Sequence, residues 1–253
     1  MPVIPWEKLT FTDFEQILLH GIKGDKPEWI ARSEKDFMVG SLKFCESFWE
    51  REILADHPNK ETLLSWIKGV RLESFFKEFT KETFKGKKIA ARRPPPTQFQ
   101  NYVPEEFTSW VSDTVAEYKR IKMLVPWKAV KFPWEEEKPT LILPLGVEPE
   151  KPRLLWDARF LNLFLKHCPF SLDGVDKVPT VAWEGMHLFK LDHKSGYLHV
   201  PFHRDSWTFL GVEWEGEVLV FTALAFGGSN CPVIYHSLSE ATGRYIRRLQ
   251  IPL

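Results

Sequence analysis

Hydrophobic residues in the first 80 positions recur at the spacing of amphipathic helices. A capping box at 12–15 predicts a helix that ends near Gly24, a second helix is expected after Ser33, and a third after Asn59. The expected inner faces are Phe37, Met38, Leu42, Cys45, Phe48, Trp49 and Ile53 in the second helix, and Leu63, Leu64, Ile67 and Val70 in the third. We therefore expect residues 1–80 to be a helical N-terminal region whose apolar faces are buried.

The next segment, residues 81–100, differs in composition. It contains one carboxylate, Glu82, and six cations, which are Lys81, Lys85, Lys87, Lys88, Arg92 and Arg93. A proline triplet at 94–96 favours extended backbone and stops helices. We expect a basic, proline-rich linker that acts as a semi-rigid spacer, with cations that either face solvent or bind phosphate.

Residues 101–253 combine the helical spacing of hydrophobic residues with short runs typical of β-strands. A helical rhythm runs from Pro104 to Leu124, and a second helix is expected to contain residues 237–248. Short strand-like runs lie at 141–143, 154–156, 187–191 and 218–221, and the strands that flank Glu215-Gly216 are predicted to form a hairpin. This mixture predicts an α+β fold.

Composition narrows the class of protein. The chain has 253 residues, with 34 basic against 34 acidic side chains, and its hydrophobic fraction of 43% is that of a globular domain rather than a disordered chain. No apolar run approaches the roughly 18 residues that a membrane span requires, and the start lacks a signal-peptide pattern. The three cysteines are far apart in sequence, which favours a reducing compartment. We expect an intracellular protein, cytoplasmic or nuclear, without a membrane partner.

One stretch carries candidate chemistry. An apolar strand pattern ends in Asp192, and a turn with Ser195 and Gly196 follows. A carboxylate at a strand end can bind a hard cation, and the backbone N–H groups of such a turn can bind phosphate oxygens. The alternative is that Asp192 caps the turn or helix that follows it.

Two further blocks flank this stretch in the sequence. The upstream block is 153–162 (RLLWDARFLN), the central block is 189–197 (FKLDHKSGY), and the downstream block is 221–232 (FTALAFGGSNCP). In this order they resemble the fingers and palm of a reverse transcriptase, of the LTR type or of the DIRS-like type that carries a tyrosine recombinase. The resemblance covers about residues 101–253. It implies a right-hand polymerase fold with fingers and a partial palm.

The resemblance also implies a reaction. A primer 3′-hydroxyl attacks the α-phosphate of a deoxynucleotide with the help of two Mg²⁺ ions, and the partners are an RNA or DNA template with its primer. Asp192 is implied as the first catalytic, metal-binding carboxylate, and the carbonyl of His193 as a further metal ligand. Arg159 is implied to contact the template strand.

Five more residues are implied to bind the incoming nucleotide. Arg153 would reach the triphosphate, and the amides of Ser195 and Gly196 would donate to the same phosphates. Tyr197 would lie under the sugar as a steric gate against a 2′-hydroxyl, and Phe226 would pack near the sugar.

The sequence departs from the family pattern in several places. Ala225, Gly228 and Cys231 stand where Pro, Leu and Ala are usual. The Tyr-x-Asp-Asp hairpin that bears the second metal site should follow the helix at 237–248, yet the sequence stops at Leu253. We expect a fragment truncated before that motif and inactive as it stands. The alternatives are a non-catalytic remnant that binds nucleic acid and a fragment without function.

Overall fold

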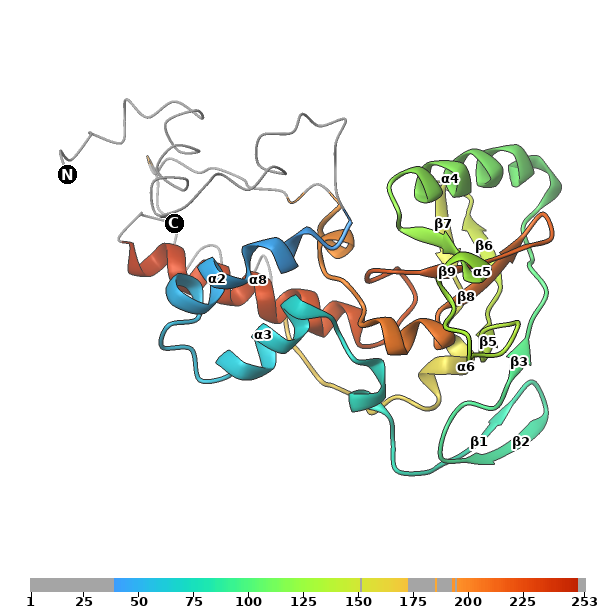
Figure 1. Ribbon diagram of the computed structural model, residues 1–253, viewed down its shortest axis with the longest axis horizontal. Coiled ribbons are helices and arrows are strands. Elements are labelled where there is room, and N and C mark those ends of the chain that lie inside the picture. Colours follow the sequence, from blue (N-terminus) through green and yellow to red (C-terminus); the bar gives the residue numbers. More distant parts are fainter. Residues whose placement is uncertain (1–38, 151, 173–184, 186–192, 194, 250–253) are drawn as a thin grey trace. The chain divides into compact units, whose positions relative to one another are not determined.

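The described part of the chain is a mixed α+β structure with helices and three sheets (Figure 1). The computed structural model describes residues 39–150, 152–172, 185, 193 and 195–249. The helices are η4 (Ser41–Cys45), α2 (Glu46–Phe48), η5 (Trp49–Ile53), α3 (Lys60–Lys68), η6 (Leu72–Phe75), η7 (Glu105–Phe107), α4 (Thr108–Arg120), α5 (Trp127–Val130), α6 (Arg159–Asn162), η9 (Gly196–His199), η10 (Arg204–Phe209) and α8 (Cys231–Arg248). The strands are β1 (Thr80–Phe84), β2 (Lys87–Ala91), β3 (Thr97–Gln98), β4 (Leu124–Pro126), β5 (Leu141–Ile142), β6 (Leu145–Glu148), β7 (Arg153–Trp156), β8 (Gly211–Trp214) and β9 (Glu217–Phe221).

The largest sheet has five strands in the order β3-β5-β8-β9-β4. β3, β5 and β8 run parallel to one another, whereas β9 runs antiparallel to both of its neighbours, β8 and β4. Trp214 pairs with Glu217 across a two-residue turn, and both turn residues, Glu215 and Gly216, have positive φ, as a type I′ turn requires. The hairpin predicted around this dipeptide is therefore confirmed.

Helices form within the predicted ranges 59–70 and 104–124, but the second ends at Arg120, and Leu124 is the first residue of β4. α3 follows Asn59, and three of its predicted inner residues, Leu63, Leu64 and Ile67, are buried. The second pattern is α4, which begins at Thr108 after the short helix η7. The expected helix at 12–24 and the expected strand at 187–191 lie outside the described residues.

The helix expected after Ser33 differs from its prediction in the part that the structure describes. It consists of three short pieces: η4 is a 3-10 helix, α2 is one α-helical turn and η5 is a π-helix. In the last piece the backbone N–H of Leu54 donates to the carbonyl of Trp49, five residues earlier. Trp49 and Ile53 are nevertheless buried, so the apolar face was identified correctly although its helix type was not.

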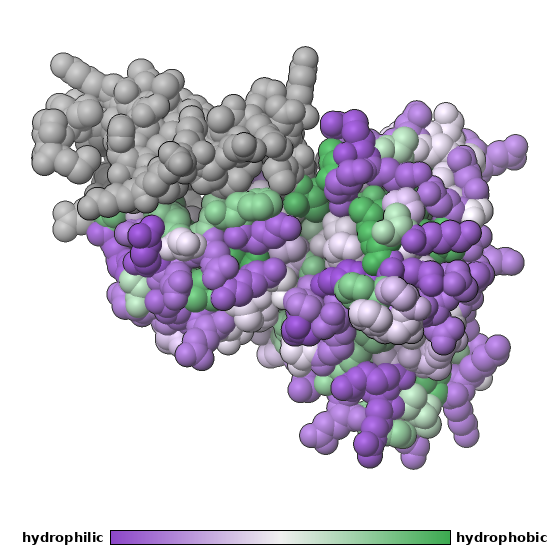
Figure 2. Space-filling model, viewed as in Figure 1, coloured by the Kyte–Doolittle hydropathy of each residue, from purple (hydrophilic) through white to green (hydrophobic). Residues whose placement is uncertain are grey.

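The first half of the stretch expected to be an extended spacer is a β-hairpin. β1 and β2 pair antiparallel from Thr80 with Ala91 to Phe84 with Lys87, and Lys85 and Gly86 form the turn with positive φ. The visible face of this hairpin has hydrophilic residues with hydrophobic ones among them (Figure 2).

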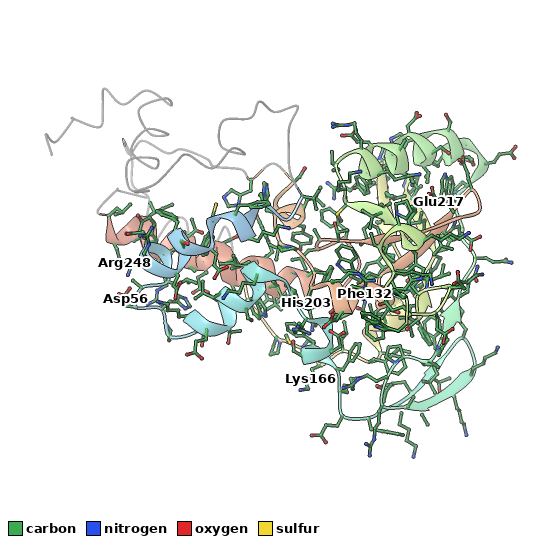
Figure 3. The ribbon with its side chains drawn as sticks, viewed as in Figure 1. Asp56, Phe132, Lys166, His203, Glu217 and Arg248 are labelled. Atoms are coloured by element: carbon green, nitrogen blue, oxygen red, sulfur yellow. The ribbon has the colours of Figure 1, made fainter. Side chains whose placement is uncertain are left out.

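One hydrophobic core contains buried residues from both sides of the hairpin, from Trp49 to Ala241 in the sequence. Backbone bonds join the same regions: the N–H of Val70 donates to the carbonyl of Pro201 over 2.8 Å, and the N–H of His203 donates to the carbonyl of Val70 over 2.9 Å. At the far end of α8, Arg248 forms an ion pair with Asp56 (Figure 3). The described residues before the hairpin thus share a core with those after it.

None of the described helices is both long and apolar enough to cross a membrane.

Candidate functional site

The three sequence blocks meet in the structure. The ring of Phe226, from the downstream block, stacks on the ring of Tyr197, from the central block, with centroids 4.9 Å apart and an angle of 28° between the planes. The next residue, Gly227, lies against the end of β7 in the upstream block. Segments separated by up to 70 residues of sequence therefore form one surface region.

Gly227 is required at the contact between the downstream and upstream blocks. Its φ is +129°, and a Cβ built there would be 1.9 Å from the carbonyl oxygen of Trp156. Asn162 holds the loop at two points: its Nδ2 donates to the carbonyl of Gly227 over 2.9 Å, and its Oδ1 accepts from the N–H of Ser229 over 2.9 Å. The close approach and the two bonds fix the loop that carries Phe226.

Asp157 orients Arg159 at the edge of this region. The guanidinium donates from Nε over 2.8 Å and from Nη2 over 2.6 Å to the two carboxylate oxygens of Asp157. The Asp157 side chain is 7% exposed, whereas that of Arg159 is 69% exposed. The hydrogen bonds from Arg159 lower the pKa of Asp157 against the opposing effect of burial, so the pair keeps its charges. Two of the five guanidinium donors are thus engaged, and the charged head faces solvent.

Aromatic side chains fix the position of Tyr197. Tyr235 of α8 contacts it edge to face, with ring centroids 5.2 Å apart, in addition to the stack with Phe226. Burial raises the pKa of Tyr197, so its hydroxyl is neutral at physiological pH. Phe226 itself is 56% exposed. The pair therefore presents an exposed aromatic ring on a supported one.

Tyr235 also contacts the central block at two further points. Its hydroxyl lies 2.6 Å from Nδ1 of His193, whose side chain is exposed. A Cβ at Gly196 would lie 2.2 Å from the same hydroxyl, so the absence of a side chain at Gly196 makes room for Tyr235. Ser195, directly before η9, is exposed and has φ of +54°. Ser195, Gly196 and Tyr197 thus lie next to one another, as their sequence order requires.

Arg153 lies at the opposite end of β7 from Trp156, about 10 Å away along the strand. Side chains alternate between the two faces of a strand. Arg153 is exposed, whereas Leu154 and Trp156 are buried. The strand ends at Trp156, because the N–H of Ala158 donates to the carbonyl of Trp156 over 2.9 Å and turns the chain at Asp157.

The predicted metal site depends on a residue outside the described part of the chain, Asp192. Among the described residues, no three His, Cys, Asp or Glu side chains are placed so that they could share a metal ion. His193 is described, and its ring is occupied by the contact with Tyr235. Magnesium binding therefore stays a prediction.

Sequence reasoning did not assign roles to Asp157, Asn162 and Tyr235. The first two lie within the upstream block, so their signal was their position in that motif. Tyr235 comes three residues after the downstream block and had no signal beyond this proximity. The buried donors Trp156 Nε1 and Asn230 Nδ2 have no hydrogen-bond partner within the described structure.

Comparisons of the sequence with known proteins give no match. No protein-family model matches the chain, and no curated protein is significantly similar to it.

Solved structures give a distant likeness. The foamy viral protease-reverse transcriptase in complex with double-stranded DNA has 14% sequence identity and a TM-score of 0.46, and the alignment covers 85% of this chain and 36% of that one. The same viral protein in complex with an RNA/DNA hybrid has 13% identity and a TM-score of 0.46, with 82% and 28% covered. This chain therefore spans about a third of the length of the viral proteins that it matches.

Proposed function

We propose that residues 101–253 form part of the fingers and palm of a template-directed DNA polymerase of the reverse transcriptase class, from an LTR or DIRS-like retroelement. The observation that carries this proposal is the meeting of the three sequence blocks, with Phe226 stacked on Tyr197 and Gly227 seated on the carbonyl of Trp156. Contact between these blocks is what a shared site requires.

In this proposal Tyr197 and Phe226 bind the sugar of an incoming deoxynucleotide. The Tyr197 ring is supported by Tyr235 and Phe226, so it cannot easily move away from a 2′-hydroxyl. A fixed ring excludes a 2′-hydroxyl by steric overlap, and the ring loses no conformational entropy when the nucleotide binds. Ser195 and Gly196 would donate backbone N–H groups to the phosphates, and Arg153 would supply a positive charge.

Arg159 binds the template strand in this proposal. Its exposed guanidinium is held by the partly buried carboxylate of Asp157, so its remaining donors have a defined direction. Phosphate groups are well matched to such a planar donor array.

Asp192 is proposed as the catalytic carboxylate, with the His193 carbonyl as a further oxygen ligand. Mg²⁺, when bound there, would supply positive charge at the reacting phosphates while a primer 3′-hydroxyl attacks the α-phosphate.

Nucleotide-dependent binding tests the proposal. The chain, incubated with a template–primer and Mg²⁺, should retain a fluorescent deoxynucleotide only when that nucleotide matches the template base, and primer extension can be followed in the same samples. Asp192→Asn should abolish this retention because the ion loses its carboxylate. Asp113→Asn, at an exposed position on α4, is the matched control and should leave it unchanged. Retention that ignores the template base, or that survives Asp192→Asn, would contradict the proposal.

A further inference from the structure

The β1–β2 hairpin has two chemically different faces. The register pairs Glu82 with Ile89, and Phe84 with Lys87, on one face, where Phe84 and Ile89 pack against the core. The other face pairs Lys81 with Ala90, and Thr83 with Lys88. All four of these side chains are exposed, so the outer face consists of two lysines and two small residues.

The positive charge of this hairpin is not neutralised within the described structure. Glu82, its single carboxylate, pairs with Lys77 over 3.4 Å, and Lys77 lies outside the hairpin. Within the described ranges, Lys81, Lys87 and Lys88 have no carboxylate within ion-pair distance. Arg92 and Arg93 follow β2 directly and add two more exposed cations. Like charges held this close repel one another, and an anionic partner would relieve that repulsion.

The hairpin is fixed beside the proposed template-binding arginine. Phe84 packs edge to face on Phe160, with centroids 5.3 Å apart, and Phe160 is the neighbour of Arg159 in α6. Phe99 contacts both rings, at 5.8 Å from Phe84 and 5.2 Å from Phe160. The Lys85 cation at the turn lies close enough to Asp157 to lower the pKa of that carboxyl. The basic hairpin and the Asp157–Arg159 pair therefore lie on adjoining surface.

We infer that the outer face of the β1–β2 hairpin binds the phosphate backbone of a nucleic-acid strand that continues past Arg159. The inference rests on the proposed function for the identity of the strand, and it adds a binding surface outside the three sequence blocks. Within the two strands the outer face has two lysines, Thr83 and Ala90 but no large apolar side chain, which suits a sugar–phosphate chain.

Salt-dependent binding of an oligothymidylate tests the inference without primer, nucleotide or Mg²⁺. Each phosphate contact to a single strand contributes about 0.7 to the slope of log affinity against log salt. Lys81→Gln combined with Lys88→Gln should therefore lower the slope by about 1.4, so that the wild type loses about sevenfold more affinity than this variant when salt is raised about fourfold. Lys122→Gln combined with Lys128→Gln is the matched control. These exposed lysines flank β4, at the opposite edge of the five-stranded sheet from β3.

The outcomes separate this inference from the proposed function. Equal slopes in the wild type and the Lys81/Lys88 variant would overturn the inference, as would an equal loss of slope in the control variant. The wild type can also be tested with poly-glutamate and with anionic phospholipid vesicles. If it binds either one, and the Lys81/Lys88 variant shows the same loss of slope there as with oligothymidylate, the inference is overturned, because the surface is then not selective for nucleic acid. The oligothymidylate measurement uses neither nucleotide nor Mg²⁺, so failure of the nucleotide test alone removes the polymerase proposal and leaves the hairpin result standing.

Discussion

At the scale of single residues, the candidate site depends on a backbone contact that only one residue type permits. Gly227 brings its loop onto the carbonyl oxygen of Trp156, and Asn162 bonds to that loop at two positions. The stack of Phe226 on Tyr197 follows from this anchoring, because Phe226 directly precedes Gly227.

Gly227→Ala should destabilise the protein by about 2 to 4 kcal/mol, since it combines an unfavourable φ with a steric clash against backbone. Gly216→Ala is the control: its φ is also positive, but a Cβ there meets nothing within 4 Å, so its cost should be about 1 kcal/mol. Urea unfolding of the two variants measures the difference. Equal costs would show that the contact with Trp156 is looser than described.

The Asp157–Arg159 pair predicts a dependence of stability on pH. Arg159 lowers the pKa of Asp157 in the folded state, so the pair stabilises the protein above the unfolded pKa of about 3.9, and this contribution is lost as pH falls through the lowered value. Arg159→Gln should raise the pKa of Asp157 and move acid unfolding to higher pH. Carbon-13 titration of the carboxyl group and circular dichroism check the two effects.

Arg120→Gln is the control for that pH experiment. Arg120 pairs with Glu117 in α4, and both side chains are more than half exposed, at 59% and 51%. Exposed pairs contribute little to stability. An acid midpoint that moves equally in both variants would contradict a specific role for the pair at the site.

At the scale of elements, the sequence predicted those whose periodicity or turn chemistry is strong. α3 and α4 have buried residues at helical spacing, and Glu215-Gly216 lies between two apolar strands. The β1–β2 hairpin was missed because its strands show no clear alternation: four of their ten residues are charged, and Phe84 and Ile89 are the only large apolar residues in them. Six cations and a proline triplet gave the stronger signal, for a spacer.

The sequence also predicted part of the candidate site and missed the rest. The order of the three blocks in the sequence pointed to a common site, and Phe226, Gly227, Tyr197 and Trp156 do meet. The two bonds of Asn162 to the loop and the contacts of Tyr235 depend on how α6 and α8 pack, which no local pattern encodes.

The hairpin should depend on Phe84 for its attachment. Phe84→Ala removes a half-buried ring from its contacts with Phe99 and Phe160 and should cost about 2 kcal/mol. Phe79→Ala, at a ring that is 53% exposed, should change stability by less than about 0.5 kcal/mol. Urea unfolding gives both values, and faster amide exchange confined to residues 80–91 in the Phe84 variant would confirm which element is released.

At the scale of the whole described structure, a single core predicts a single unfolding transition. Ile67 of α3 is fully buried in the cluster that also contains Ile234 and Leu238 of α8. Ile67→Ala should therefore lower the midpoints of tryptophan fluorescence and of circular dichroism together, by about 3 kcal/mol in stability. Leu172→Ala, at a side chain that is 65% exposed, is the control with little effect. Two separate transitions would show that the described regions unfold independently.

The bridge between Val70 and Phe202 also sets a delay during synthesis on the ribosome. About 130 residues separate the two partners, and translation proceeds at about 5 to 20 residues per second, so the bridge cannot form until roughly 7 to 26 seconds after Val70 is made. Through that interval the apolar face of α3 has no final partner from the later part of the chain. A nascent polypeptide in this condition is a natural client for holding chaperones, which shield exposed apolar surface until the rest of the core is translated.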